Sequence, residues 1–119
     1  MKWIFLIGID DFSIYMLKKL NYPGCISAYV VENTQGRFYV DYGDEHVFFD
    51  PIENRNDFEE LINQVPYINP AIVMMTYTSS DNVRSILQQE DFPNDIYIDN
   101  DLGLLAPLKE YVSLGMPMD

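Results

Sequence analysis

The chain has 119 residues, 48% of them hydrophobic, and its nineteen acidic side chains outnumber seven basic ones to give a formal charge of −12. This length and hydrophobic content predict one folded domain over residues 1–119 and exclude a disordered chain. A field of this sign repels phosphate backbones and anionic lipid, so we expect no nucleic acid and no membrane as partners, and a protein with a basic surface instead.

The single cysteine, Cys25, excludes an intramolecular disulfide and favours a reducing compartment, so we expect a cytoplasmic location. The apolar run near the N-terminus stops at two aspartates and is too short for a secretory signal. No apolar run approaches the roughly 18 residues of a membrane span. The acidity has a simpler explanation that stays open, which is that net charge keeps a protein dissolved.

The first predicted elements are a central strand and a helix. The segment "KWIFLIGI", residues 2–9, is apolar without alternation, which is typical of a strand covered on both faces. Apolar residues at helical spacing in "DDFSIYMLKKL" predict a helix after it, and "NYPG" ends that helix.

The next segment predicts an antiparallel meander at residues 26–50. It is rich in β-branched and aromatic residues, and short turns at residues 33–36 and 43–44 divide it into three strands. Connections this short join antiparallel neighbours, because a parallel crossover needs a longer segment.

Helices and strands alternate in the rest of the chain. The segment "NRNDFEELINQVP" predicts a helix that begins at Asn56 and ends before Pro66. The segment "PAIVMMTY" predicts a second central strand. It is followed by a helix in "SSDNVRSILQQE", a short strand in "DIYID" and a last helix in "PLKEYVSLG".

The predicted order of elements is therefore β-α-β-β-β-α-β-α-β-α. Two doubly apolar strands, each followed by a helix, indicate an α/β protein with helices on both faces of its sheet. We predict a three-layer α/β sandwich around a mixed sheet of about six strands, with the meander as its antiparallel side.

Carboxylates and hydroxyls follow several of the predicted strands. If the central strands run parallel, their carboxyl ends share one edge, which is where open α/β sheets bind ligands. Oxygen ligands of this kind suit Mg²⁺ or another hard cation. The alternative ligand site predicted in this way comprises Asp10, Asp11, Asp50, Thr76 and Asp99. Aspartates and serines at these places are also typical helix caps, and capping requires no ligand.

The spacing of these residues resembles a response-regulator receiver domain. In that family an acidic pair holds Mg²⁺, a middle aspartate accepts phosphate, and a threonine and a lysine sense the phosphate. The matching positions in this chain are Asp10, Asp11, Asp50 and Thr76 or Thr78. The chain departs from the family in two places: no lysine lies near residues 99–101, and residues 36–45 alternate like a strand where the family has a helix.

The sequence contains no recognisable catalytic or cofactor motif. Cys25 and His46 are its only thiol and imidazole, and no third group is placed to orient them. A phosphate-binding loop, a dinucleotide fingerprint and a nucleophile elbow are also absent. We therefore expect a non-catalytic protein that uses no cofactor.

Acids and tyrosines gather in the predicted meander. The candidate partner-binding residues are Tyr39, Asp41, Tyr42, Asp44 and Glu45. Acids would steer a basic partner, and tyrosines supply contact area at a low cost in conformational entropy. Such rings also line the half-buried faces of sheets, an explanation that needs no partner. We expect an acidic protein-interaction domain, of which an immunity or inhibitor protein that blocks a basic nuclease is one concrete form.

Overall fold

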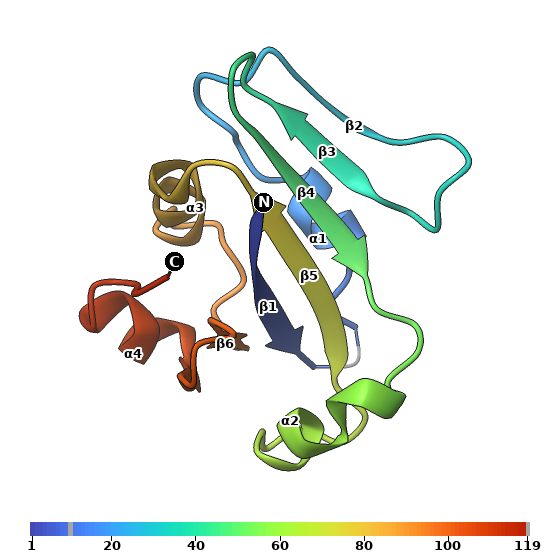
Figure 1. The fold of residues 1–119 in the computed structure, drawn as a ribbon, viewed down its shortest axis with the longest axis vertical. Coiled ribbons are helices and arrows are strands. Elements are labelled where there is room, and N and C mark those ends of the chain that lie inside the picture. Colours follow the sequence, from blue (N-terminus) through green and yellow to red (C-terminus); the bar gives the residue numbers. More distant parts are fainter. Residues whose placement is uncertain (10, 119) are drawn as a thin grey trace.

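The structure is a computed structural model that describes residues 1–9 and 11–118. It is a mixed α/β protein dominated by a seven-stranded antiparallel sheet, with four α-helices in the described residues (Figure 1). The strands, in sheet order, are β2 (Ser27–Val30), β3 (Phe38–Asp41), β4 (His46–Pro51), β5 (Ala71–Tyr77), β1 (Lys2–Gly8), β6 (Ile96–Asp99) and β7 (Leu105–Pro107). The helices are α1 (Ile14–Lys18), α2 (Glu59–Asn63), α3 (Ser80–Leu87) and α4 (Leu108–Ser113), with a short 3₁₀ helix, η1 (Asn56–Phe58), before α2.

The two doubly apolar strands, β1 and β5, lie side by side at the centre of the sheet. Their register runs from Lys2 opposite Tyr77 to Gly8 opposite Ala71, and they are antiparallel. The side chains of β1 alternate between two cores, with Ile4 on one face and Phe5 on the other. Burial on both faces explains the absence of alternation in their sequences.

The predicted mixed sheet is wrong, because every strand pairing in the described residues is antiparallel. The sheet also has a seventh strand, β7, in the segment before the last helix. An apolar run predicts burial on both faces but carries no information about strand direction, so helix–strand alternation alone suggested parallel crossovers.

The predicted meander is confirmed. β2, β3 and β4 pair consecutively and antiparallel within residues 27–51. Period-two alternation places Phe38 and Val40 in the main core and leaves Tyr39 and Asp41 on the opposite face. Gly43 adopts a φ of +95° in the β3–β4 turn, a conformation that glycine adopts without strain.

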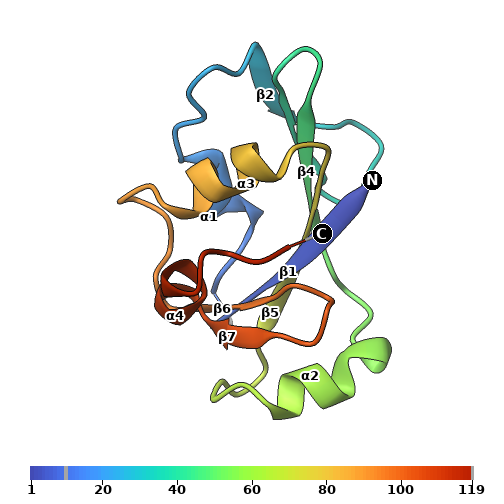
Figure 2. The ribbon, with the colours of Figure 1, turned by 60° about the vertical axis from the view of Figure 1, so that its left-hand side comes forward.

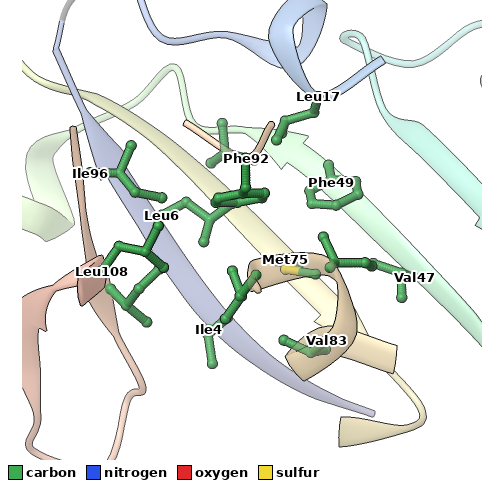
Figure 3. Packing of buried hydrophobic residues seen from close by; sticks show 14 of the residues in the cluster. Ile4, Leu6, Leu17, Val47, Phe49, Met75, Val83, Phe92, Ile96 and Leu108 are labelled. Carbon is green, nitrogen blue, oxygen red and sulfur yellow. The ribbon is translucent and has the colours of Figure 1, made fainter. Parts of the chain in front are cut away.

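Three helices cover one face of the sheet. α1, α3 and α4 lie together on the same side of the strands (Figure 2). Figure 3 shows Leu17 of α1, Val83 of α3 and Leu108 of α4 directed toward the buried side chains of the central strands. The helices thus bury their apolar faces in one large core, which is the main stabilising feature of the fold.

The opposite face is covered at one end only. α2 lies at the lower end of β5 in Figure 1. Apolar side chains of η1 and α2 pack on a second, smaller core, which contains Phe5, Ile7 and Ile72. Phe58 meets the ring of Phe5 edge-on at 5.2 Å between centroids. The predicted three-layer sandwich is not confirmed, since the helical layer on this side covers part of the sheet.

A close approach of chain segments fixes the turn after β1. A Cβ atom at Gly8 would lie 2.7 Å from the Cβ of Phe12, so only glycine fits beside that ring. Phe12 is buried in the main core. The contact holds the start of the α1 segment tightly against the end of β1.

Candidate functional site

The uncovered end of the second face carries a row of aromatic side chains. Cross-strand register places Tyr29 opposite Tyr39, Tyr39 opposite Phe48, and Phe48 opposite Thr76. Thr76 in turn lies opposite Trp3 of β1. Because residues in register share a face, these side chains cross five neighbouring strands. We call Tyr29, Tyr39, Phe48, Thr76 and Trp3 the aromatic row.

The rings of Tyr29, Tyr39 and Phe48 contact their neighbours in the aromatic row, whereas the Trp3 indole donates from Nε1 to Oδ2 of Asp101 at 3.0 Å. Tyr29 and Tyr39 meet edge-on with their centroids 5.5 Å apart, and Tyr39 stacks on Phe48 at 4.7 Å. His46 lies 5.2 Å from the Phe48 ring, on the side toward the β3–β4 turn. These contacts order the rings before any partner arrives, which lowers the entropic cost of binding.

The aromatic row is accessible to solvent. Tyr29 is 50% exposed and Trp3 is 43% exposed, while Tyr39 and Phe48 are half-buried by their neighbours. Rings with equal area on the other side of the meander, such as Phe38 and Phe49, are buried. The exposed row is therefore a separate surface feature and no extension of the core.

An ion pair borders the aromatic row. The Arg37 guanidinium donates from Nε to Oδ1 of Asp50 at 2.7 Å and from Nη2 to Oδ2 at 3.1 Å. The guanidinium carbon lies 4.7 Å from the centroid of the Phe48 ring. The hydrogen bonds to Asp50 raise the pKa of Arg37 and hold its planar group against the ring. Arg37 therefore serves as part of the surface and is already neutralised by Asp50.

Carboxylates flank the other side of the row at the β3–β4 turn. Asp41 accepts a hydrogen bond from the Gly43 N–H at 2.8 Å, and Tyr42 N–H donates to the Glu45 carbonyl at 2.9 Å. Asp44 is exposed at the tip. We call Asp41, Asp44 and Glu45 the acidic turn. The predicted partner-binding acids thus lie together, next to the aromatic row.

The two predicted tyrosines separate onto opposite faces. Tyr39 belongs to the aromatic row, and burial, then the charge of Asp41, raise its pKa. Tyr42 packs against the main core, where burial and then the Cys25 side chain raise its pKa to about 12. Both phenols remain protonated donors at neutral pH, but only Tyr39 is placed on the same surface as Asp41.

The chain matches no protein-family model, no curated protein and no solved structure. No described helix is long and apolar enough to cross a membrane.

The residues of the alternative ligand site do not converge where the structure describes them. The prediction required parallel central strands, but β1 runs antiparallel to both β5 and β6. Asp11 follows the end of β1, whereas Thr76 lies opposite Trp3 near its start. Asp10 lies outside the described residues. The premise of a shared edge is therefore wrong, because the carboxyl ends of antiparallel neighbours lie at opposite edges of the sheet.

The remaining carboxylates of that site have other partners. Asp50 is paired with Arg37, and Asp99 accepts a hydrogen bond from the Asp101 N–H at 2.9 Å. Burial raises the pKa of Asp99, and the nearby charge of Asp101 adds to that rise. Among the described residues, no group of three or more histidine, cysteine, aspartate or glutamate side chains is arranged to hold a metal ion.

The capping alternative is also unsupported for the described residues. The residue that precedes α1 is Ser13, and its side chain makes no capping hydrogen bond. Ser79 precedes α3, likewise without a side-chain cap. Asp11 therefore does not cap α1, and it is an exposed side chain in the turn.

The single thiol and imidazole point to different sides of the sheet. Cys25 packs against the main core, and His46 lies on the face of the aromatic row. The His46 backbone N–H donates to the Thr78 hydroxyl oxygen at 2.9 Å. The two residues thus form no thiol–base pair.

Sequence reasoning missed most of the aromatic row. Trp3, Tyr29 and Phe48 of the row, and His46 beside it, were not among the predicted site residues. A partial signal exists in "HVFFDP", where alternation places His46, Phe48 and Asp50 on one face. The full row depends on cross-strand register, because its members come from distant segments of the sequence. Trp3 and Thr76, for example, are 73 positions apart in the chain but lie opposite each other in the sheet.

Proposed function

We propose that this protein is a small non-catalytic interaction domain that binds a protein with a basic surface. The binding surface comprises the aromatic row and the acidic turn. The single observation that carries the proposal is the solvent-accessible aromatic row, in which the rings of Tyr29, Tyr39 and Phe48 pack in series, uncovered by any described helix and flanked by carboxylates.

The two parts of this surface have different roles in the proposal. The acidic turn raises the rate of encounter with a basic partner, because opposite charges steer diffusion over several ångströms. The aromatic row slows dissociation, because large rings bury much area and Tyr and Trp are common anchors of interfaces. Partner arginines also gain from stacking on Tyr or Trp faces.

A cytoplasmic immunity or inhibitor protein is the specific form that we propose. An enzyme that acts on a polyanion has a basic active site, and an acidic surface of this kind would block it. The charge supports this choice over nucleic acid as the partner, since −12 repels a phosphate backbone. No observation favours the Mg²⁺ site as a second candidate.

Kinetic measurements on two matched variants test the proposal. Binding partners are first captured from a native lysate at low salt, identified, and purified. In the test variant Asp41→Asn, Asp44→Asn and Glu45→Gln remove three charges from the acidic turn. In the control variant Glu90→Gln, Asp91→Asn and Asp95→Asn remove three charges from exposed positions outside the meander.

We expect the test variant to lower the association rate by about tenfold at low salt, and the control variant to have a much smaller effect. The difference between the two variants should shrink as salt screens the charges. Equal effects of the two variants would show that net charge alone matters and would contradict a local binding surface.

A further inference from the structure

A hollow of about 460 Å³ lies between α1, the β2–β3 connection and the adjacent ends of β4 and β5. Phe12, Ile14, Val30 and Ile52 supply apolar walls. We call this cavity the α1 hollow. Its volume lies within the range of roughly 300–1,000 Å³ that is common for small-molecule sites.

The charged side chains that line the α1 hollow are basic, whereas the chain as a whole is acidic. Lys18 and Arg55 line it, and the described lining residues include no carboxylate. Within the described part of the chain neither cation forms an ion pair with a carboxylate. This is unexpected in a chain with nineteen acids and seven bases.

The contacts of these residues prepare the hollow for an anion. Arg55 Nη1 donates to the Asn69 Oδ1 at 2.6 Å, which orients the guanidinium and leaves its other N–H groups available. Tyr15, 62% exposed, stands at the rim, and the Lys19 ammonium lies 4.2 Å from its ring centroid. A third cation is therefore held near the opening.

We propose that the α1 hollow binds a small organic monoanion with an apolar body. The anionic group, a carboxylate or its equivalent, lies between Lys18 and Arg55, and the apolar body contacts Phe12, Ile14 and Ile52. Charge complementarity carries this assignment: a neutral apolar ligand would leave the two cations unmatched, and a cationic one would be repelled by them.

This inference goes beyond the proposed function and is independent of it. The α1 hollow shares no residue with the aromatic row or the acidic turn, and it favours the opposite charge. A ligand in the hollow would leave the proposed interaction surface free.

Calorimetry with the full chain tests the proposal with two probes of the same ring size. The probes are 2-naphthoate, which carries a carboxylate, and 2-naphthylmethanol, which does not. We expect saturable one-to-one binding of 2-naphthoate, at least about tenfold tighter than any binding of the alcohol, because hydrogen bonds to ionised groups are the stronger ones. Equal binding of the two probes, or no saturation with either, would overturn the proposal.

Two lysine variants locate the binding site. Lys18→Met removes the charge and keeps an apolar stem at an exposed position, so the fold should be retained. It should weaken 2-naphthoate binding about tenfold and leave the alcohol unaffected. Lys109→Met makes the same change on α4, outside the hollow, and should leave the affinity for 2-naphthoate unchanged. Identical affinities for the two variants would contradict the site.

The acidic-turn variant separates this proposal from the proposed function. Asp41→Asn, Asp44→Asn and Glu45→Gln should leave 2-naphthoate binding saturable and no weaker than in the wild type. A loss of binding in that variant would place the anion elsewhere and overturn the assignment to the α1 hollow, whatever the outcome for the protein partner.

Discussion

The two faces of the meander carry similar rings in different surroundings. Phe48 and Phe49 are neighbours in β4, yet Phe49 is fully buried beneath the helices while Phe48 lies in the aromatic row. In β3, Phe38 and Tyr39 are divided in the same way. One strand therefore contributes both to the core and to the proposed binding surface, because alternate residues point to opposite faces.

The largest expected effect is a difference in stability between variants that remove a ring from each face of β4. Phe49→Ala should lower the free energy of unfolding by about 3–5 kcal/mol, because it removes a buried ring and leaves a cavity. Phe48→Ala should cost about 1–2 kcal/mol, since the half-exposed ring loses its contacts with Tyr39, His46 and the Arg37 guanidinium but leaves no buried cavity. Urea denaturation of the two variants measures the difference. Equal losses would show that the aromatic row belongs to the core.

The two tyrosines of this segment sharpen the comparison through pH. Burial raises the pKa of Tyr42 from 10.0 to about 12 in the folded protein. Because the unfolded phenol loses its proton first, the contribution of Tyr42 to the free energy of unfolding should be constant below pH 10 and fall as the pH rises from 10 toward 12. Tyr42→Phe should make that fall shallower. Thermal unfolding at a series of pH values measures this dependence. A Tyr42→Phe variant with the same pH dependence as the wild type would contradict the buried position of Tyr42.

The smallest expected effect concerns the ion pair beside the row. The Arg37 and Asp50 side chains are 41% and 19% exposed, so solvent screens their attraction. Asp50→Asn should therefore lower the free energy of unfolding by about 1 kcal/mol or less. The variant should leave an unpaired guanidinium beside the aromatic row. It should therefore lower the affinity for a basic partner more than it lowers the free energy of unfolding. A variant that binds the partner as well as the wild type would show that this edge of the row lies outside the interface.

The sequence predicts the local elements of this fold better than it predicts how the strands pair. The meander follows from alternation and from turns near Gly36 and Gly43, and the helices follow from amphipathic spacing. The direction of β1 relative to β5 does not follow, since a strand buried on both faces has the same pattern in either direction. Strand β7 is only three residues long and lacks a pattern of its own.

The same limit applies to the candidate site. Tyr39 and the acidic turn lie close together in the sequence, so they could be grouped before the structure was known. Trp3 and Tyr29 join them only through the order β2-β3-β4-β5-β1, which long-range pairing determines. The premise of the alternative ligand site was wrong for the same reason, because it depended on the direction of strands that are distant in the sequence.

The most direct test of the central claim is an NMR map of backbone and aromatic shifts on adding the captured basic partner. We expect the largest changes to fall on Tyr29, Tyr39, Phe48 and the acidic turn, while α3 and α4 are nearly unaffected. Changes concentrated on α3 and α4, with the aromatic row unperturbed, would contradict the central claim.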